Sequence, residues 1–295
     1  MNQFGGDWTK AKIEILVEYA KAYLVVMHGR NKINIERYGE RYQFKLMYFD
    51  GFAGSGEIIR NNDSVEDGSN VETTIGAARR IIEIETPIPF DRYYFVEKDT
   101  DNYTLLEERT KLAFPGKKIN TFQGDCNEKL VAMSRFLKQP ENKSYRTLAY
   151  IDPCGMQVNW ASMESMKNLP IDVWALVPTG MGVVRLLKND GQITDAWLTK
   201  LELFLGMSRE DIKNYFYKRT ETLFEDYPLI TKESFAVTKS ANLYRDKLKE
   251  IFSFVSEPYE LKNSVNSVMY HLYFATNNKA GVTIANDIVK KYSSQ

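Results

Sequence analysis

The sequence has few residues of the kinds that hold metal ions or form disulfide frameworks. Its 295 residues include only two cysteines, Cys126 and Cys154, and two histidines, His28 and His271. The cysteines lie far apart, and no C-x-x-C pair occurs. Zinc and iron–sulfur centres need clusters of such ligands, so we expect no metal site. The low cysteine content also fits a reducing compartment.

The chain also lacks an excess of charge of either sign and any long apolar run. Its 39 acidic and 39 basic residues give a formal net charge of zero. A protein that holds nucleic acid mainly by neutralising phosphates usually carries a basic excess, so any such surface would have to be local. No apolar segment approaches the length of a membrane span, and the N-terminus shows no signal-peptide pattern. We therefore expect a cytoplasmic protein that engages no membrane.

What the chain does have is a regular alternation of predicted strands and helices. An amphipathic helix over 9–27 comes first, with apolar residues at helical spacing. A polar loop is expected over 57–70. The predicted strands are 44–49, 93–97, 120–123, 147–151 and 172–177, and the predicted helices between them are 71–85, 101–113, 128–138 and 160–168. This rhythm predicts an α/β fold with a doubly wound, mostly parallel sheet.

The alternation stops after Gly180, and a different pattern follows. Residues 183–250 have a helical pattern and scattered charges, which predicts a helical insertion that recognises substrate or partner. Strands over 251–261 and 267–276 and a helix over 281–292 would then complete a seven-stranded sheet. The expected organisation is a cofactor-binding core over 1–182 with the N-terminal helix, the insertion over 183–250, and a return to the core over 251–295.

Acidic residues close four successive predicted strands, at Asp50, Glu97, Asp125 and Asp152. Each has a simple structural explanation: a tight turn, a solvated strand end, a helix N-cap and an Asp-Pro turn, in that order. Ligands of open α/β sheets bind outside the carboxyl ends of the strands, so the four together indicate a binding site. The glycine turn Asp50–Gly56 lacks the Lys and Ser/Thr of a Walker A loop, which disfavours an ATP phosphate site.

These motifs resemble those of class I S-adenosylmethionine-dependent methyltransferases and, within them, the bacterial three-Cys-motif partner proteins. The resemblance extends over nearly the whole chain and implies a Rossmann-like methyltransferase fold with S-adenosyl-L-methionine as cofactor. The matching pieces are Lys12-Ile13-Glu14-Ile15-Leu16 with Tyr19, Tyr48–Gly56, Phe95–Asp99, Gly124–Asn127, Ile151–Met156 with Trp160, and Tyr270–Asn278.

The resemblance also implies residue roles. The glycine turn would surround the methionine portion of the cofactor, Glu97 would bind the ribose hydroxyls, and Asp125 would mark the adenine end. The implied cofactor-binding residues are Asp50, Gly51, Phe52, Ala53, Gly54, Gly56, Glu97, Lys98, Asp125, Cys126 and Asp152. Catalysis would fall to Asp152 and Pro153. Substrate binding would fall to Cys154, Gly155 and Trp160.

The fourth motif departs from the pattern of related enzymes. Nucleic-acid amino-methyltransferases typically end a D-P-P-[YF] motif with an aromatic residue that stacks the flipped base. Here the motif is Asp152-Pro153-Cys154-Gly155, and Trp160 could supply the aromatic ring instead. Cytosine-C5 enzymes use a Pro-Cys nucleophile after the equivalent strand, but the surrounding pattern differs here. A covalent mechanism through Cys154 is therefore disfavoured.

The leading functional prediction is a methyltransferase that acts on amino groups of DNA or RNA by direct displacement. It rests on the Asp-Pro motif and on the basic residues of the insertion, which are Arg185, Lys188, Arg209, Lys213, Lys218, Arg219, Arg245, Lys247 and Lys249. Acidic residues alternate with these, which favours a solvated helical surface over a nucleic-acid site as their explanation. The alternative is an S-adenosylmethionine-binding or catalytically silent partner subunit of a separate three-Cys-motif enzyme.

Overall fold

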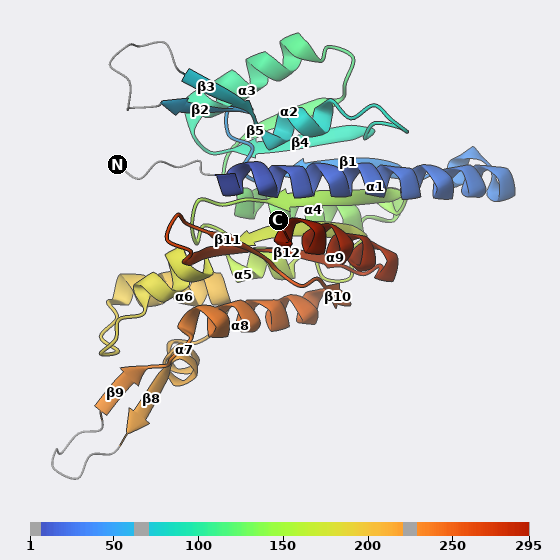
Figure 1. Ribbon diagram of the computed structural model, residues 1–295. Coiled ribbons are helices and arrows are strands. Elements are labelled where there is room, and N and C mark those ends of the chain that lie inside the picture. Colours follow the sequence, from blue (N-terminus) through green and yellow to red (C-terminus); the bar gives the residue numbers. More distant parts are fainter. Residues whose placement is uncertain (1–6, 62–70, 221–228, 295) are drawn as a thin grey trace.

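The computed structural model describes residues 7–61, 71–220 and 229–294 (Figure 1). Its centre is an eight-stranded sheet with the order β10-β12-β7-β6-β1-β4-β5, and β11 also pairs with β12. The parallel strands are β1 (Lys45–Asp50), β4 (Arg92–Glu97), β5 (Ile119–Gln123), β6 (Tyr145–Ile151) and β7 (Ile171–Val177). The antiparallel pairings involve β12 (Val268–Thr276), β10 (Phe254–Val255) and β11 (Tyr259–Lys262).

Helices cover both faces of this sheet, which confirms the doubly wound α/β prediction. Alternate residues of β1 enter different cores: Leu46 and Tyr48 pack in one, and Met47 and Phe49 in the other. In Figure 1, α1 (Asp7–Tyr38) and α9 (Lys279–Ser293) lie in front of the sheet. The opposite face is covered by α4 (Cys126–Lys138), α5 (Trp160–Glu164) and the helices of the insertion. The remaining helices, α2 (Ala77–Ile82) and α3 (Thr100–Ala113), contribute buried residues to the α1 side.

The burial of the central strands explains their composition. In β6 and β7 every residue but the second is buried. Strands covered on both faces have near-continuous apolar runs instead of alternation. The short apolar segments of the sequence therefore correspond to strands of the sheet interior.

The predicted secondary structure is wrong at two places in the part of the chain before β4. The first helix continues to Tyr38, eleven residues beyond the expected end. The expected loop and the start of the expected helix over 71–85 instead form an antiparallel pair, β2 (Glu57–Asn61) with β3 (Val71–Ile75), and 62–70 lies outside the described residues. The β-branched residues of β3 favour a strand there, and α2 begins only at Ala77.

The insertion is not wholly helical. It contains α6 (Asp195–Leu205), α7 (Arg209–Phe216) and α8 (Ala236–Ile251), and between α7 and α8 the strands β8 (Tyr217–Thr220) and β9 (Leu229–Lys232) pair as antiparallel strands that project from the body (Figure 1). Its apolar side chains belong to the same core as those of the sheet.

The end of the sheet also differs from the prediction of one strand over 251–261. The segment forms two short strands, β10 and β11, so the sheet has eight strands and not seven. Pro258 lies between them and has no backbone N–H to continue a ladder, which accounts for the break.

Candidate active site

A pocket of about 530 Å³ opens at the carboxyl edge of the sheet. It lies where the chain order reverses, because β4 and β5 extend the sheet on one side of β1 and β6 extends it on the other. Such switch points are the usual ligand sites of open α/β sheets. Ten of the residues predicted from the sequence line it: Gly51, Phe52, Gly54, Glu97, Lys98, Asp125, Cys126, Asp152, Pro153 and Cys154.

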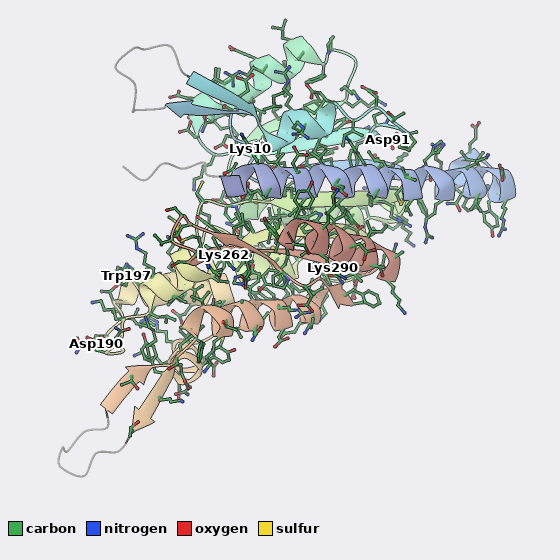
Figure 2. All side chains as sticks on the ribbon, viewed as in Figure 1. Lys10, Asp91, Asp190, Trp197, Lys262 and Lys290 are labelled. Carbon is green, nitrogen blue, oxygen red and sulfur yellow. The ribbon has the colours of Figure 1, made fainter. Side chains whose placement is uncertain are left out.

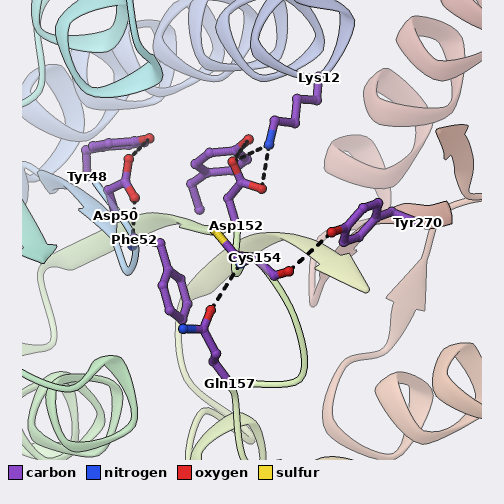
Figure 3. Close-up of polar contacts among 9 residues, drawn as sticks. Lys12, Tyr48, Asp50, Phe52, Asp152, Cys154, Gln157 and Tyr270 are labelled. Atoms are coloured by element: carbon purple, nitrogen blue, oxygen red, sulfur yellow. Dashed lines mark hydrogen bonds and ion pairs between the residues drawn. The ribbon is translucent and has the colours of Figure 1, made fainter. Parts of the chain in front are cut away.

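Asp50 is not part of the pocket wall; it lies beneath it. Its side chain is 1% exposed, and it accepts hydrogen bonds from the Phe52 N–H at 3.0 Å and the Tyr48 hydroxyl at 3.4 Å (Figure 3). Desolvation raises the pKa of Asp50 to about 7. The Asp50 carboxyl therefore stabilises the glycine turn through its hydrogen bond from Phe52 and does not itself line the pocket.

The glycine turn needs its glycines for two different reasons. A Cβ at Gly51 would stand 2.5 Å from the Cys126 Sγ, so the backbone must pass close to α4. Gly54 has φ +62°, a conformation that glycine adopts at little cost. Its N–H donates to Glu97 Oε2 at 2.9 Å. The turn is thus tied to the end of the neighbouring strand.

Glu97 combines the predicted position with a defined orientation. Besides the bond from Gly54, its Oε1 accepts from the Asp99 N–H at 2.8 Å. A carboxylate oxygen has two acceptor positions, so each oxygen retains one for a ligand hydroxyl. Two backbone amides therefore orient the Glu97 carboxylate, and its two remaining acceptor positions suit a ligand with two adjacent hydroxyl groups.

Asp125 is a helix N-cap that also lies at the pocket. It is the N-cap of α4 and accepts from the backbone and side-chain nitrogens of Asn127, each at 2.8 Å. It also lines the pocket and forms an ion pair with Lys98 at 3.2 Å. Beside it, burial raises the pKa of the Cys126 thiol well above its ordinary value, so this thiol stays protonated and apolar in character.

Asp152 is held in an ion pair that the sequence motifs did not predict. The Lys12 ammonium, from α1, donates to both carboxylate oxygens at 2.7 and 2.6 Å (Figure 3). The Tyr150 hydroxyl donates to Oδ2 at 3.0 Å. The Lys12 and Asp152 side chains are only 10% and 17% exposed. The sequence signal was a lysine beside the apolar stripe of the first helix, which alone does not identify a site residue.

The turn after Asp152 is fixed by two residues to which the sequence analysis gave no site role. Gln157 Oε1 accepts from the Cys154 N–H at 3.0 Å, and the Tyr270 hydroxyl donates to the Cys154 carbonyl at 3.2 Å (Figure 3). Burial also raises the pKa of the Cys154 thiol, with Asp152 as a second cause. A thiol with a raised pKa is a poor nucleophile, which agrees with the expectation against covalent chemistry.

Four other predicted site residues do not line the pocket, in addition to Asp50. Ala53, Gly56 and Gly155 belong to the same two turns but not to its wall. Trp160 is 5% exposed and packs in the core, edge-on to Tyr244 with ring centroids 5.7 Å apart. The structure therefore does not bring an aromatic ring from Trp160 to the acceptor side.

The pocket includes further residues to which no site role was assigned from the sequence, although four of them belong to the matching motifs. They are Lys12, Gly124, Met156 and Tyr270 from the motifs, and Asn102, Gln157, Leu176 and Lys200. Lys200 is the contribution of the insertion. Within the described ranges, no group of three or more His, Cys, Asp or Glu side chains could hold a metal ion. No helix in the described part of the chain is long and apolar enough to cross a membrane.

No protein-family model and no curated protein matches the chain. Among solved structures, it is similar to Trm1 from Pyrococcus horikoshii in complex with S-adenosyl-L-methionine (TM-score 0.44, 12% identity), with 97% of this chain and 59% of that chain covered. It is also similar to spermidine synthase from Thermotoga maritima (TM-score 0.39, 9% identity; 81% and 56% covered). A conserved hypothetical protein from Streptococcus pyogenes has a TM-score of 0.30 and 14% identity (64% and 85% covered). The chain thus spans less than two thirds of the length of Trm1 and of spermidine synthase.

Proposed function

We propose that this protein is an S-adenosylmethionine-dependent methyltransferase and that the pocket at the carboxyl edge holds the cofactor. The observation that carries the proposal is the meeting of Gly54, Glu97, Asp125 and Asp152, from four successive strand ends, at one pocket. The pocket volume of about 530 Å³ lies within the range of roughly 300–1,000 Å³ usual for small-molecule sites.

The residues present fit such a cofactor. The open backbone of Gly51–Gly54 would face its amino-acid portion, and Glu97 would accept from its ribose hydroxyls. Lys98, Asp125 and Cys126 would flank the adenine end. When bound, S-adenosylmethionine supplies an electrophilic methyl group on a sulfonium.

Asp152 would orient the methyl acceptor, with Pro153 shaping the turn beside it. In the ion pair with Lys12 its oxygens only accept hydrogen bonds, and Oδ2 already accepts two. Oδ1 accepts one and keeps a position for an acceptor N–H. An amino group held there would direct its lone pair away from Asp152, and the protein would contribute positioning and exclusion of water. An amino group of DNA or RNA is the acceptor that we propose.

The test of cofactor binding is calorimetry with S-adenosylmethionine. We expect binding at micromolar concentration and a loss of roughly 10- to 100-fold in Glu97→Gln, because hydrogen bonds to a charged group contribute about 1.5–3 kcal/mol. Glu108→Gln, an exposed change on α3, is the matched control and should bind as the wild type does. Absence of binding to the wild-type protein would overturn the proposal.

A second function is favoured by one observation, the neutralisation of Asp152 by Lys12. A carboxylate already paired inside the protein suits a cofactor-binding partner subunit of another enzyme, such as a three-Cys-motif protein. Transfer of a labelled methyl group to pools of DNA, RNA and protein distinguishes the two functions. Labelling of one pool supports the methyltransferase, whereas cofactor binding without labelling of any pool supports the partner subunit.

A further inference from the structure

Lys200 is a pocket residue that belongs to the insertion. Its side chain, from α6, lines the pocket together with Cys154 and Tyr270. The other two lysines of the pocket are paired, Lys12 with Asp152 and Lys98 with Asp125. Lys200 forms no ion pair with any residue that the structure describes. Lys200 therefore gives the pocket a positive charge that no ion pair with a described residue neutralises.

One turn earlier on α6, Trp197 is left 37% exposed (Figure 2). The Lys188 ammonium stands over its ring, 5.8 Å from the centroid. The backbone of Lys188 is held by a hydrogen bond that its carbonyl accepts from the Tyr217 hydroxyl at 2.7 Å. An exposed indole with a cation on one face and a second lysine one turn away forms a surface that we call the α6 rim, defined as Lys188, Trp197 and Lys200.

The acidic residues near the α6 rim are engaged elsewhere. Asp195 and Glu202 both accept from Arg209, each at 2.8 Å, on another side of α6. Asp190 accepts from the Gln192 N–H at 3.0 Å within its own loop. The rim therefore presents aromatic surface and positive charge together, beside the mouth of the pocket.

We propose that the α6 rim binds a single-stranded nucleic acid, with one base stacked on Trp197 and backbone phosphates on Lys188 and Lys200. Stacking on an aromatic side chain combined with a cationic path for the backbone is the general way in which proteins hold single strands. A base stacked within a duplex can reach neither an indole ring nor an enclosed pocket. That the bound strand brings its acceptor base into the pocket rests on the proposed function. Single-strand binding by the α6 rim does not depend on that function.

The probes are fluorescein-labelled single-stranded DNA and RNA oligonucleotides of mixed sequence, with the matched duplex, followed by anisotropy. We expect Trp197→Ala to weaken single-strand binding at least 5-fold, as for loss of one stacked base. Trp197→Phe should restore part of the affinity. Lys200→Ala should weaken binding and reduce the slope of log affinity against log salt by about 0.7, the value for one phosphate on a single strand. Lys290→Ala, an exposed lysine of α9 outside the insertion, is the matched control and should bind as the wild type does.

Calorimetry with S-adenosylmethionine on the same variants separates this inference from the proposed function. Unchanged cofactor affinity with weakened oligonucleotide binding in Trp197→Ala, a residue that does not line the pocket, supports the rim. Wild-type affinity for oligonucleotides in both Trp197→Ala and Lys200→Ala, or a wild-type protein that binds the duplex as well as the single strand, overturns the inference. If the wild type binds oligonucleotide through the rim but no cofactor, the proposed function fails and the rim stands. If it binds cofactor and methylates protein but binds no oligonucleotide, the rim inference fails and the methyltransferase stands.

Discussion

The ion pair between Lys12 and Asp152 gives the sharpest quantitative prediction. Lys12→Met keeps the aliphatic stem in the apolar surroundings of α1 but removes the ammonium that donates to both oxygens of Asp152. The carboxylate would then remain largely buried, with the Tyr150 hydroxyl as its one remaining donor among the contacts described above. The change should therefore destabilise the folded protein.

The magnitude follows from the burial of the pair. Exposed ion pairs contribute about 0–1 kcal/mol, whereas removing one partner of a fully buried pair costs about 3–5 kcal/mol. With side chains 10% and 17% exposed and one hydrogen bond retained, we expect a loss of about 2–3 kcal/mol. For a chain of 295 residues, that corresponds to a decrease of about 3–5 °C in the melting temperature.

The assay is denaturant unfolding of a double-mutant cycle made of Lys12→Met, Asp152→Asn and the combination. Each single change breaks the ion pair between Lys12 and Asp152, so the double variant should be more stable than the sum of the two losses predicts, by about 2 kcal/mol. Additive losses, with a coupling energy near zero, would refute the reasoning. Methyl transfer should fall in Lys12→Met while cofactor affinity stays within a few-fold, because Lys12 acts by positioning Asp152.

Three further predictions concern the turns and the core. Asp50→Asn should remove a pH dependence of stability. The pKa of Asp50 is about 7 in the folded protein and near 3.9 in the unfolded chain, so the wild type loses stability as pH rises between these values. In denaturant titrations, the stability of the variant relative to the wild type should therefore increase by about 2–3 kcal/mol from pH 5 to pH 8. Gly51→Ala should abolish cofactor binding in calorimetry, because its Cβ would meet the Cys126 Sγ at 2.5 Å, whereas Gly155→Ala, with nothing within 4 Å, should bind normally. Trp160→Ala should cost about 3–5 kcal/mol of stability in the same unfolding assay and leave cofactor affinity unchanged in the fraction that remains folded.

The central architecture could be predicted from the sequence because it depends on local patterns. Short apolar runs identified the central strands β1, β6 and β7, since strands buried on both faces must be apolar nearly throughout. The region around β2 and β3 could not be predicted in this way. A run such as Val71–Ile75 is too short to distinguish a strand from the first turn of a helix by periodicity. The pairing of Val71–Ile75 with Glu57–Asn61 determines that this segment is a strand.

The sequence by itself determined where the candidate site lies, because the carboxyl ends of parallel strands must meet at one edge and Glu97, Asp125 and Asp152 each close a strand. Only the tertiary structure decided what surrounds these residues. It brought Lys12 to Asp152 across 140 positions and Lys200 from the insertion to the pocket, and it placed Trp160 in the core. Strand periodicity is a property of neighbouring residues, whereas these contacts depend on how whole helices pack against the sheet, which no local pattern specifies.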